Sequence, residues 1–383
     1  MYTVAQLKES VSGLLSGTDL DNVTNLNGAL ERAARKLAQK ADVPEATARQ
    51  SITLYDGVYT YTAPTNIFGG ALIDLRPQGV ARTSLDEVRK QPIALFDQQK
   101  HLLPSGYAVT LEHTKGTPLL RVTTPKPMPR VIIDTMKETT GWTAGGSLGS
   151  LAQDLTVYYE YPASLRFTLT GSSTGTLTKT ISSLSIATYE DVAVGFLAIR
   201  IPDGATASNL TSVAVRLGSD SSNYDEVTAT TGFLEAFKAG DWMLIALDFS
   251  GATSTGTPDW TALDYLQVRL AHSGTFTNFR VGGFWLALPS PHELIYQTPA
   301  IFLVGSTLNK TITNDEDQII LNDAAYLLYE HECALQIAVQ QRNDDQIAQL
   351  RAILYGGEDD LGLYEQYRAD NPSNELREIG NYY

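Results

Sequence analysis

The sequence predicts an α+β multidomain protein, in which a discontinuous domain of bundled helices and a small β-sheet is interrupted by an inserted antiparallel β-sandwich. Near both ends of the chain, apolar residues recur at spacings of three and four, which is the period of a helix. The middle is rich in Ser, Thr and Gly and alternates with the period of a strand. We therefore expect 1–136 and 290–370 to form one domain, 137–289 to be the insert, and 371–383 to be a tail.

Length and composition limit the number of domains and the class of protein to which the chain can belong. The chain has 383 residues, enough for about two or three domains with separate cores. No apolar stretch approaches the roughly 20 residues of a membrane span, and the first residues lack the pattern of a secretory signal. The single Cys333 has no partner within the chain for a disulfide. We expect no membrane contact, and stability that comes from packing or from association.

The charge is strongly negative. The formal net charge is −15, and 311–383 alone holds 15 acidic and 4 basic residues. A surface this acidic repels phosphate, which argues against affinity-driven binding of nucleic acid. A channel that DNA passes through without adhering is still compatible with it.

The first elements predicted are two amphipathic helices, over 3–16 and 26–40. The second carries a group of bases outside its apolar stripe: Arg32, Arg35, Lys36 and Lys40. These bases are candidates for contact with channel DNA or with an acidic partner. A solvated helix face is the simpler interpretation.

Strands and one helix follow. Asp56-Gly57 lies between two runs rich in Thr, Tyr and Val, a pattern typical of a hairpin turn. A charged helix is expected over about 84–98, with Ser84 as its cap. A second hairpin is expected over 107–124, before the proline cluster at 125–129.

The middle of the chain is predicted to form a series of strands. Runs such as LTVYYEY, LAIRIP, SVAVRLG, WMLIALDF and YLQVRL alternate between Leu155 and Leu288, and turn residues separate them. Seven or more such strands predict an antiparallel sandwich.

The return segment contains a further pair of strands and then helices. Asn322 caps a helix whose apolar stripe includes Ala324, Leu328 and Leu335. Asn343 caps the next helix, which ends at Gly356-Gly357, and a short helix is expected over about 359–369. The last residues, SNELREIGNYY, show no period.

Motifs for catalysis, metal binding or nucleotide binding are missing from the sequence. His331-Glu332 lacks the second histidine of a zinc helix, and no phosphate loop or nucleophile elbow is present. Asp241, Asp248 and Asp264 could pair for glycoside chemistry, but strand-end roles are favoured. We expect no enzyme, no cofactor and no metal site.

Aromatic residues in expected turns offer one binding hypothesis. Trp142, Tyr224 and Trp260 could stack on the faces of sugars if they are exposed on a rim of the sandwich. The alternative is that each ring packs beneath a loop.

The insert resembles the jelly-roll modules found in carbohydrate-binding and laminin-G-like domains. The resemblance rests on SVAVRLGSDSSNYDEV (212–227), FKAGDWMLIALDFS (237–250) and LDYLQVRL (263–270). Such modules often hold a structural calcium with acids in the last strand. Here Gly282 and Gly283 occupy that stretch, so the resemblance does not extend to the ion.

The flanks resemble the head-to-tail adaptor (connector) proteins of tailed bacteriophages. The resemblance rests on the amphipathic start, the Tyr-rich ITLYDGVYTYTAP, and the helical end NDAAYLLYEHECALQIAVQQ with NDDQIAQLRAILYGG. It implies a ring of about twelve copies beneath the portal, lining the DNA channel. It also implies that the tail docks on the portal through Arg377, Tyr382 and Tyr383.

These observations lead to one main expectation and one alternative. The main expectation is a structural virion protein of the neck, assembled in the host cytoplasm, that joins the portal to tail or nozzle proteins and carries the sandwich outward. The alternative is a glycan-binding virion or surface protein that acts through the sandwich. A glycan hydrolase is a third, weaker possibility.

Overall fold

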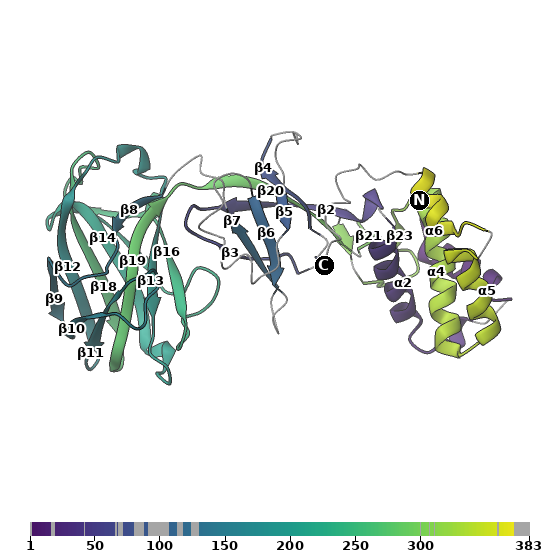
Figure 1. Cartoon of the computed structure of the whole chain (residues 1–383), viewed down its shortest axis with the longest axis horizontal. Coiled ribbons are helices and arrows are strands. Elements are labelled where there is room, and N and C mark those ends of the chain that lie inside the picture. Colours follow the sequence, from purple (N-terminus) through teal and green to yellow (C-terminus); the bar gives the residue numbers. More distant parts are fainter. Residues whose placement is uncertain are drawn as a thin grey trace. The chain divides into compact units, whose positions relative to one another are not determined.

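The computed structural model shows an α+β protein with a large β-sandwich (Figure 1). The residues that the structure describes are 2–16, 20–41, 43–65, 67, 72–79, 88–90, 107–112, 118–123, 130–298, 300–305, 307–309, 311–357 and 360–370. The chain divides into two compact units. The helical unit consists of Met1–Ile52, Thr62–Thr123 and His292–Tyr383, and the sandwich unit of Thr53–Tyr61 and Thr124–Pro291.

The α-helices of the described chain all lie in the helical unit. They are α1 (Val4–Leu14), α2 (Leu26–Lys40), α4 (Asp323–Gln341), α5 (Asp344–Tyr355) and α6 (Leu363–Asp370). Asn322 and Asn343 accept hydrogen bonds from the amides of Ala325 and Gln346, so both predicted caps are confirmed. Gly356, at a φ of +79°, ends α5 as predicted.

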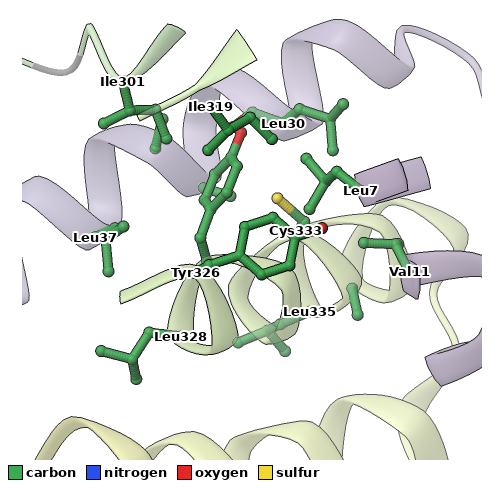
Figure 2. Close-up of a cluster of buried hydrophobic side chains, with 14 of the residues drawn as sticks. Leu7, Val11, Leu30, Leu37, Ile301, Ile319, Tyr326, Leu328, Cys333 and Leu335 are labelled. Carbon is green, nitrogen blue, oxygen red and sulfur yellow. The ribbon is translucent and has the colours of Figure 1, made fainter. Parts of the chain in front are cut away.

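Helix α4 is the centre of the helical core. It packs against α1, α2, α5 and α6, and so it is buried on nearly every side. Figure 2 shows Leu7 and Leu30 converging with Cys333 in this core, beside Ile319 from a strand. The sequence predicted that only one stripe of α4 would be buried, and the buried surface is wider than that stripe. Ala324, which the stripe included, is exposed.

Besides the sheets of the sandwich, the described residues form three small sheets. The first has the strand order β1 (Tyr2–Thr3), β23 (Gln318–Ile319), β21 (Phe302–Val304), β22 (Thr307–Asn309). The second has the order β2 (Thr47–Leu54), β20 (Ser290–Gln297), β4 (Leu72–Pro77). The third has the order β3 (Thr60–Thr62), β7 (Leu119–Thr123), β6 (Tyr107–Glu112), β5 (Val88–Lys90). The hairpin β6–β7 is confirmed.

Two sequence predictions in this region were wrong. Asp56-Gly57 does form a turn, but β2 and β3 on either side of it join different sheets and do not pair as a hairpin. Within the expected helix 84–98, the described residues 88–90 form β5, which pairs with β6 in parallel. Tertiary pairing thus overrides a local helix-capping pattern.

The sandwich unit consists of two six-stranded sheets. The first sheet has the order β10 (Leu148–Asp154), β11 (Ser164–Leu169), β19 (Phe276–Ala287), β13 (Val194–Arg200), β16 (Trp242–Asp248), with β8 (Val131–Asp134) also paired to β19. The second sheet has the order β17 (Thr253–Thr255), β15 (Asn223–Ala229), β14 (Leu210–Asp220), β18 (Leu263–His272), β12 (Ser173–Leu184), β9 (Trp142–Gly146).

Some residues differ from their expected places in the sandwich. β8 pairs with β19 and Met136 is fully buried in the sandwich core, so the sandwich begins before residue 137. LTVYYEY, expected as a strand, is a loop. Asp154 holds this loop by accepting hydrogen bonds from the amide and hydroxyl of Thr156 and from the amide of Val157.

A segment that precedes the sandwich strands in the sequence, residues 53–61, packs on the outer face of the first sheet. Phe196 and Trp285 point outward from β13 and β19, away from the sandwich core. Residues 53–61 lie over them, with the ring of Tyr55 5.2 Å from that of Phe196. Trp285 donates its indole N–H to the carbonyl of Asp56 at 3.3 Å. Residues 53–61 therefore cover the outer face of the first sheet at β13 and β19.

Candidate functional site

The outer face of the second sheet carries a row of polar side chains across six strands. Strand register places these residues side by side, in the order Thr253, Glu226, Arg216, Gln267, Thr178 and Thr143. Residues on one face of a sheet alternate with those that face its core. On β14, Arg216 accordingly lies between Val215 and Leu217, both fully buried in the sandwich core. We call this set the polar row.

Hydrogen bonds fix the polar row. Glu226 accepts from the guanidinium of Arg216 and from that of Arg269, the latter at 2.8 Å. Arg216 also donates to Gln267 at 3.2 Å, and Gln267 donates to the hydroxyl of Thr178 at 2.8 Å. The side chains are thus held in place before any ligand arrives.

A pair of tyrosines lies beside the polar row. Tyr224 and Tyr265 flank Gly218 across the strands, and their ring centroids are 6.2 Å apart. A Cβ at Gly218 would lie 2.5 Å from the Cα of Tyr224, so no larger residue fits there. The guanidinium of Arg216 lies over the ring of Tyr224, 4.4 Å from its centroid.

A cleft of about 820 Å³ opens where β15 and β17 meet the edge strand β16. Its lining combines rings, charges, small residues and five threonines: Arg216, Tyr224, Glu226, Val227, Thr228, Ala229, Thr230, Thr231, Gly232, Phe233, Ala246, Asp248, Gly251, Thr253 and Thr255. All of these residues belong to the sandwich unit. The amide of Phe233 donates to Leu244 on β16 at 2.8 Å, which fixes the wall 230–233. We call this space the cleft.

Hydrogen bonds hold the carboxylates of the cleft in place. Burial alone would raise the pKa of Glu226, but its bonds to Arg216 and Arg269 lower that pKa below the ordinary value of a glutamate. Asp248 accepts hydrogen bonds from the amide and the hydroxyl of Ser250. The cleft therefore offers fixed charges, hydroxyl groups that both donate and accept, and aromatic edges, which together suit a polyhydroxylated ligand.

The predicted aromatic rim is not present, which corrects the sequence interpretation. Trp142, Tyr224 and Trp260 are exposed by only 7%, 9% and 2%. Trp142 lies under the ammonium group of Lys179, and Arg216 covers Tyr224. Trp260 packs on Phe249 and donates its indole N–H to Asp225. None of these rings offers a free face to a sugar, although Tyr224 does line the cleft.

Four of the remaining predicted site residues lie on α2 in the helical unit. Arg32 and Arg35 are exposed on α2, and Arg32 donates to Gln340 on α4 at 3.2 Å. Lys36 is half-buried, and the ammonium of Lys40 lies 3.7 Å from the centroid of the Tyr355 ring. Arg377, Tyr382 and Tyr383 lie outside the described residues.

The residues that matter most in the cleft were not singled out by sequence reasoning. Arg216 and Glu226 lie on either side of the turn at Asp220, so a hairpin there would have placed them opposite each other. Asp248 was assigned a strand-end role, and it does end β16 while also lining the cleft. The sequence pattern around Phe233 did not identify it as a cleft residue, because its position depends on contacts made in the folded chain.

No helix in the described residues is long and apolar enough to cross a membrane. Among the same residues, no group of three or more His, Cys, Asp or Glu side chains could hold a metal ion.

The solved structures to which the chain is similar include carbohydrate-binding modules. A family 30 carbohydrate-binding module is 12% identical, with a TM-score of 0.30, over 43% of this chain and 98% of that chain. The family 11 carbohydrate-binding module of a cellulosomal cellulase of Clostridium thermocellum is 11% identical, with a TM-score of 0.30, over 43% of this chain and 96% of that chain. No family model matches the chain, and no curated protein matches it.

Proposed function

We propose that the sandwich unit binds carbohydrate and that the cleft is its binding site. The observation that carries this proposal is the lining of the cleft, where Arg216, Glu226 and Asp248 lie among five threonines and beside Tyr224 and Phe233. Charged side chains make strong hydrogen bonds to vicinal hydroxyls. The half-buried ring of Phe233 offers apolar surface to the carbon face of a sugar ring. The volume, about 820 Å³, suits a short oligosaccharide.

The proposed role is binding without hydrolysis. Glycoside cleavage needs one carboxyl group that stays protonated to donate to the leaving oxygen, besides a second carboxylate. Glu226 is unsuited to donate a proton, since Arg216 and Arg269 lower its pKa. Of the three carboxylates considered from the sequence, Asp241 and Asp264 do not line the cleft. Asp248 does line it, and it accepts hydrogen bonds from the amide and the hydroxyl of Ser250.

Affinity electrophoresis against a panel of neutral polysaccharides, followed by calorimetry with the retained ligand, tests this proposal. Thr228→Trp should abolish retention, because Thr228 is exposed in the cleft and an indole there would fill it. Arg216→Ala should weaken binding about tenfold or more, the usual cost of losing a hydrogen bond to a charged group. Arg166→Ala, on β11 of the first sheet, is the matched control. Retention that is equal in all four proteins would refute the cleft as the site.

As a second function, we propose that the helical unit assembles into the ring of a phage neck connector, joining portal and tail in the virion. The specific observation in its favour is the exposure of large apolar side chains on the surface of a well-packed unit. Leu327 and Val339 on α4 and Ile353 on α5 are each exposed by more than 40%. Helices α4 and α5 pack against each other, so these side chains lie on adjoining helices, where they could form part of an association surface.

Native mass spectrometry of the intact protein, alone and with a portal protein, tests this second function. A ring of about twelve copies would support it. A protein that stays monomeric at every concentration, with portal present, would contradict it.

A further inference from the structure

Helix α5 presents an outer face that is apolar at its centre and acidic at its start. Ala348, Ala352 and Ile353 are exposed on it together with one base, Arg351, and Ile353 is exposed by 44%. Asp344 and Asp345 are exposed at its first turn. Just beyond its end, Asp360 and Leu361 are exposed as well, Leu361 by 64%. We call this the α5 face.

Helix α2 presents a face of the opposite charge. It has four basic residues and one acidic residue, in a chain whose net charge is −15. Arg32 and Arg35 are exposed on its surface, and Lys36 is half-buried beside them. The bond from Arg32 to Gln340 uses one nitrogen of the guanidinium, which leaves other donors free. We call this the α2 face.

We infer that the α2 face of one copy docks on the α5 face of another. Arg32 and Arg35 would pair with Asp344 and Asp345, while the aliphatic stems of the arginines would cover Ile353. The interface is thus between two different faces, and such head-to-tail contacts close into rings or continue as filaments.

This inference shares with the second proposed function the requirement that the protein self-associates. It adds which two surfaces, the α2 face and the α5 face, form the contact. Charge reversal tests it on the intact protein. In the first variant Arg32→Glu is combined with Arg35→Glu, and in the second Asp344→Lys is combined with Asp345→Lys. Each variant alone should lose assembly in sedimentation velocity, because both its contacts would join like charges.

Mixing the two variants is the decisive step. The reversed α2 face of the first variant fits the reversed α5 face of the second, and the unchanged faces fit each other. The equimolar mixture should therefore assemble again, with the two variants alternating. Ile353→Ser should weaken assembly about tenfold without lowering the melting temperature, since Ile353 is exposed in a single copy.

Each other outcome overturns the inference in its own way. If both reversed variants still assemble like the wild type, the interface lies elsewhere and self-association stands. If the wild type stays monomeric, both the inference and the second proposed function fail. If Ile353→Ser lowers the melting temperature, the α5 face is covered by another part of the same chain.

Discussion

The side chain of Asp56 accepts a hydrogen bond of 2.9 Å from the backbone N–H of Arg130, although 74 residues separate the two in sequence. The carbonyl of Asp56 also accepts the indole N–H of Trp285. One turn residue thus ties the segment 53–61 both to the entry of the sandwich and to its central strand β19. This segment, which the sequence placed in the first domain, therefore belongs to the packing of the sandwich unit.

The first prediction concerns Tyr61. Its ring lies 6.0 Å from that of Phe233, and its hydroxyl accepts the amide N–H of Tyr55 at 2.8 Å. Because Tyr61 is buried, Tyr61→Ala should cost about 3–5 kcal/mol in the free energy of unfolding of the sandwich unit. Tryptophan emission during urea unfolding measures that unit, since all four tryptophans lie in 137–289.

A matched change in the other unit provides the control. Leu30, in α2, is fully buried in the helical core. Leu30→Ala should shift the far-ultraviolet circular dichroism of the helices and leave the tryptophan transition in place. A tryptophan transition that Tyr61→Ala leaves unmoved would show that 53–61 does not stabilise the sandwich.

The second prediction concerns the buried ion pair of Asp154 and Arg280, whose side chains are 2.9 Å apart. Burial by itself would raise the pKa of Asp154, but hydrogen bonds from Thr156, Arg280 and Val157 hold it well below its usual range. Asp154→Asn should cost the sandwich about 3–5 kcal/mol at pH 7, because Arg280 would lose its partner. Urea unfolding followed by tryptophan emission measures the loss.

The same pair gives the stability a pH dependence with a definite sign. A carboxyl whose pKa is lower in the folded than in the unfolded state stabilises the fold fully at a pH above its unfolded pKa, which is about 3.9. This contribution to the free energy of unfolding is lost as the pH falls below that value. The wild type should therefore lose stability between about pH 4 and pH 2 more steeply than Asp154→Asn. Asp241→Asn, at an exposed site, should follow the wild type. Identical slopes for all three would contradict the assignment.

The third prediction concerns Trp260. Its indole N–H donates to Asp225 at 2.7 Å, and the same carboxylate accepts from Ser254 at 2.6 Å. Trp260→Phe should cost about 1–3 kcal/mol, since a buried carboxylate loses a donor. Carbohydrate retention should not change, because the ring does not line the cleft. Lost retention with unchanged stability would restore the rim hypothesis.

The limits of the sequence prediction follow from the range of the interactions. Helix ends were predictable because capping is local: Asn322 and Asn343 cap through amides three residues away. The sandwich was predictable because strand alternation repeats many times over. The sheet partners of β2, β3 and β5 were not, since pairing depends on strands distant in sequence.

Exposure of the aromatic rings was harder to predict for the same reason. A turn position favours an exposed ring, but Trp260 is covered because Asp225 and Phe249 reach it from other strands. Conversely, Tyr158 and Tyr161 were assigned to a strand, and they are exposed on a loop by 38% and 78%. The cleft was beyond prediction, because its walls come from separate strands that meet only in the folded chain.

The last prediction concerns Glu332, a fully buried carboxylate in α4. It accepts hydrogen bonds from the hydroxyls of Tyr355 on α5 and Tyr364 on α6, at 3.1 and 3.4 Å, and from Gln336 at 2.8 Å. Glu332→Leu would leave both hydroxyls without this acceptor and should cost the helical unit about 3–5 kcal/mol. Glu332→Gln keeps an acceptor oxygen and should cost less. Urea unfolding followed at 222 nm measures both losses, with tryptophan emission as the internal control. Equal stability of the Leu and Gln variants would mean that the tyrosine bonds do not hold α5 and α6 to the core.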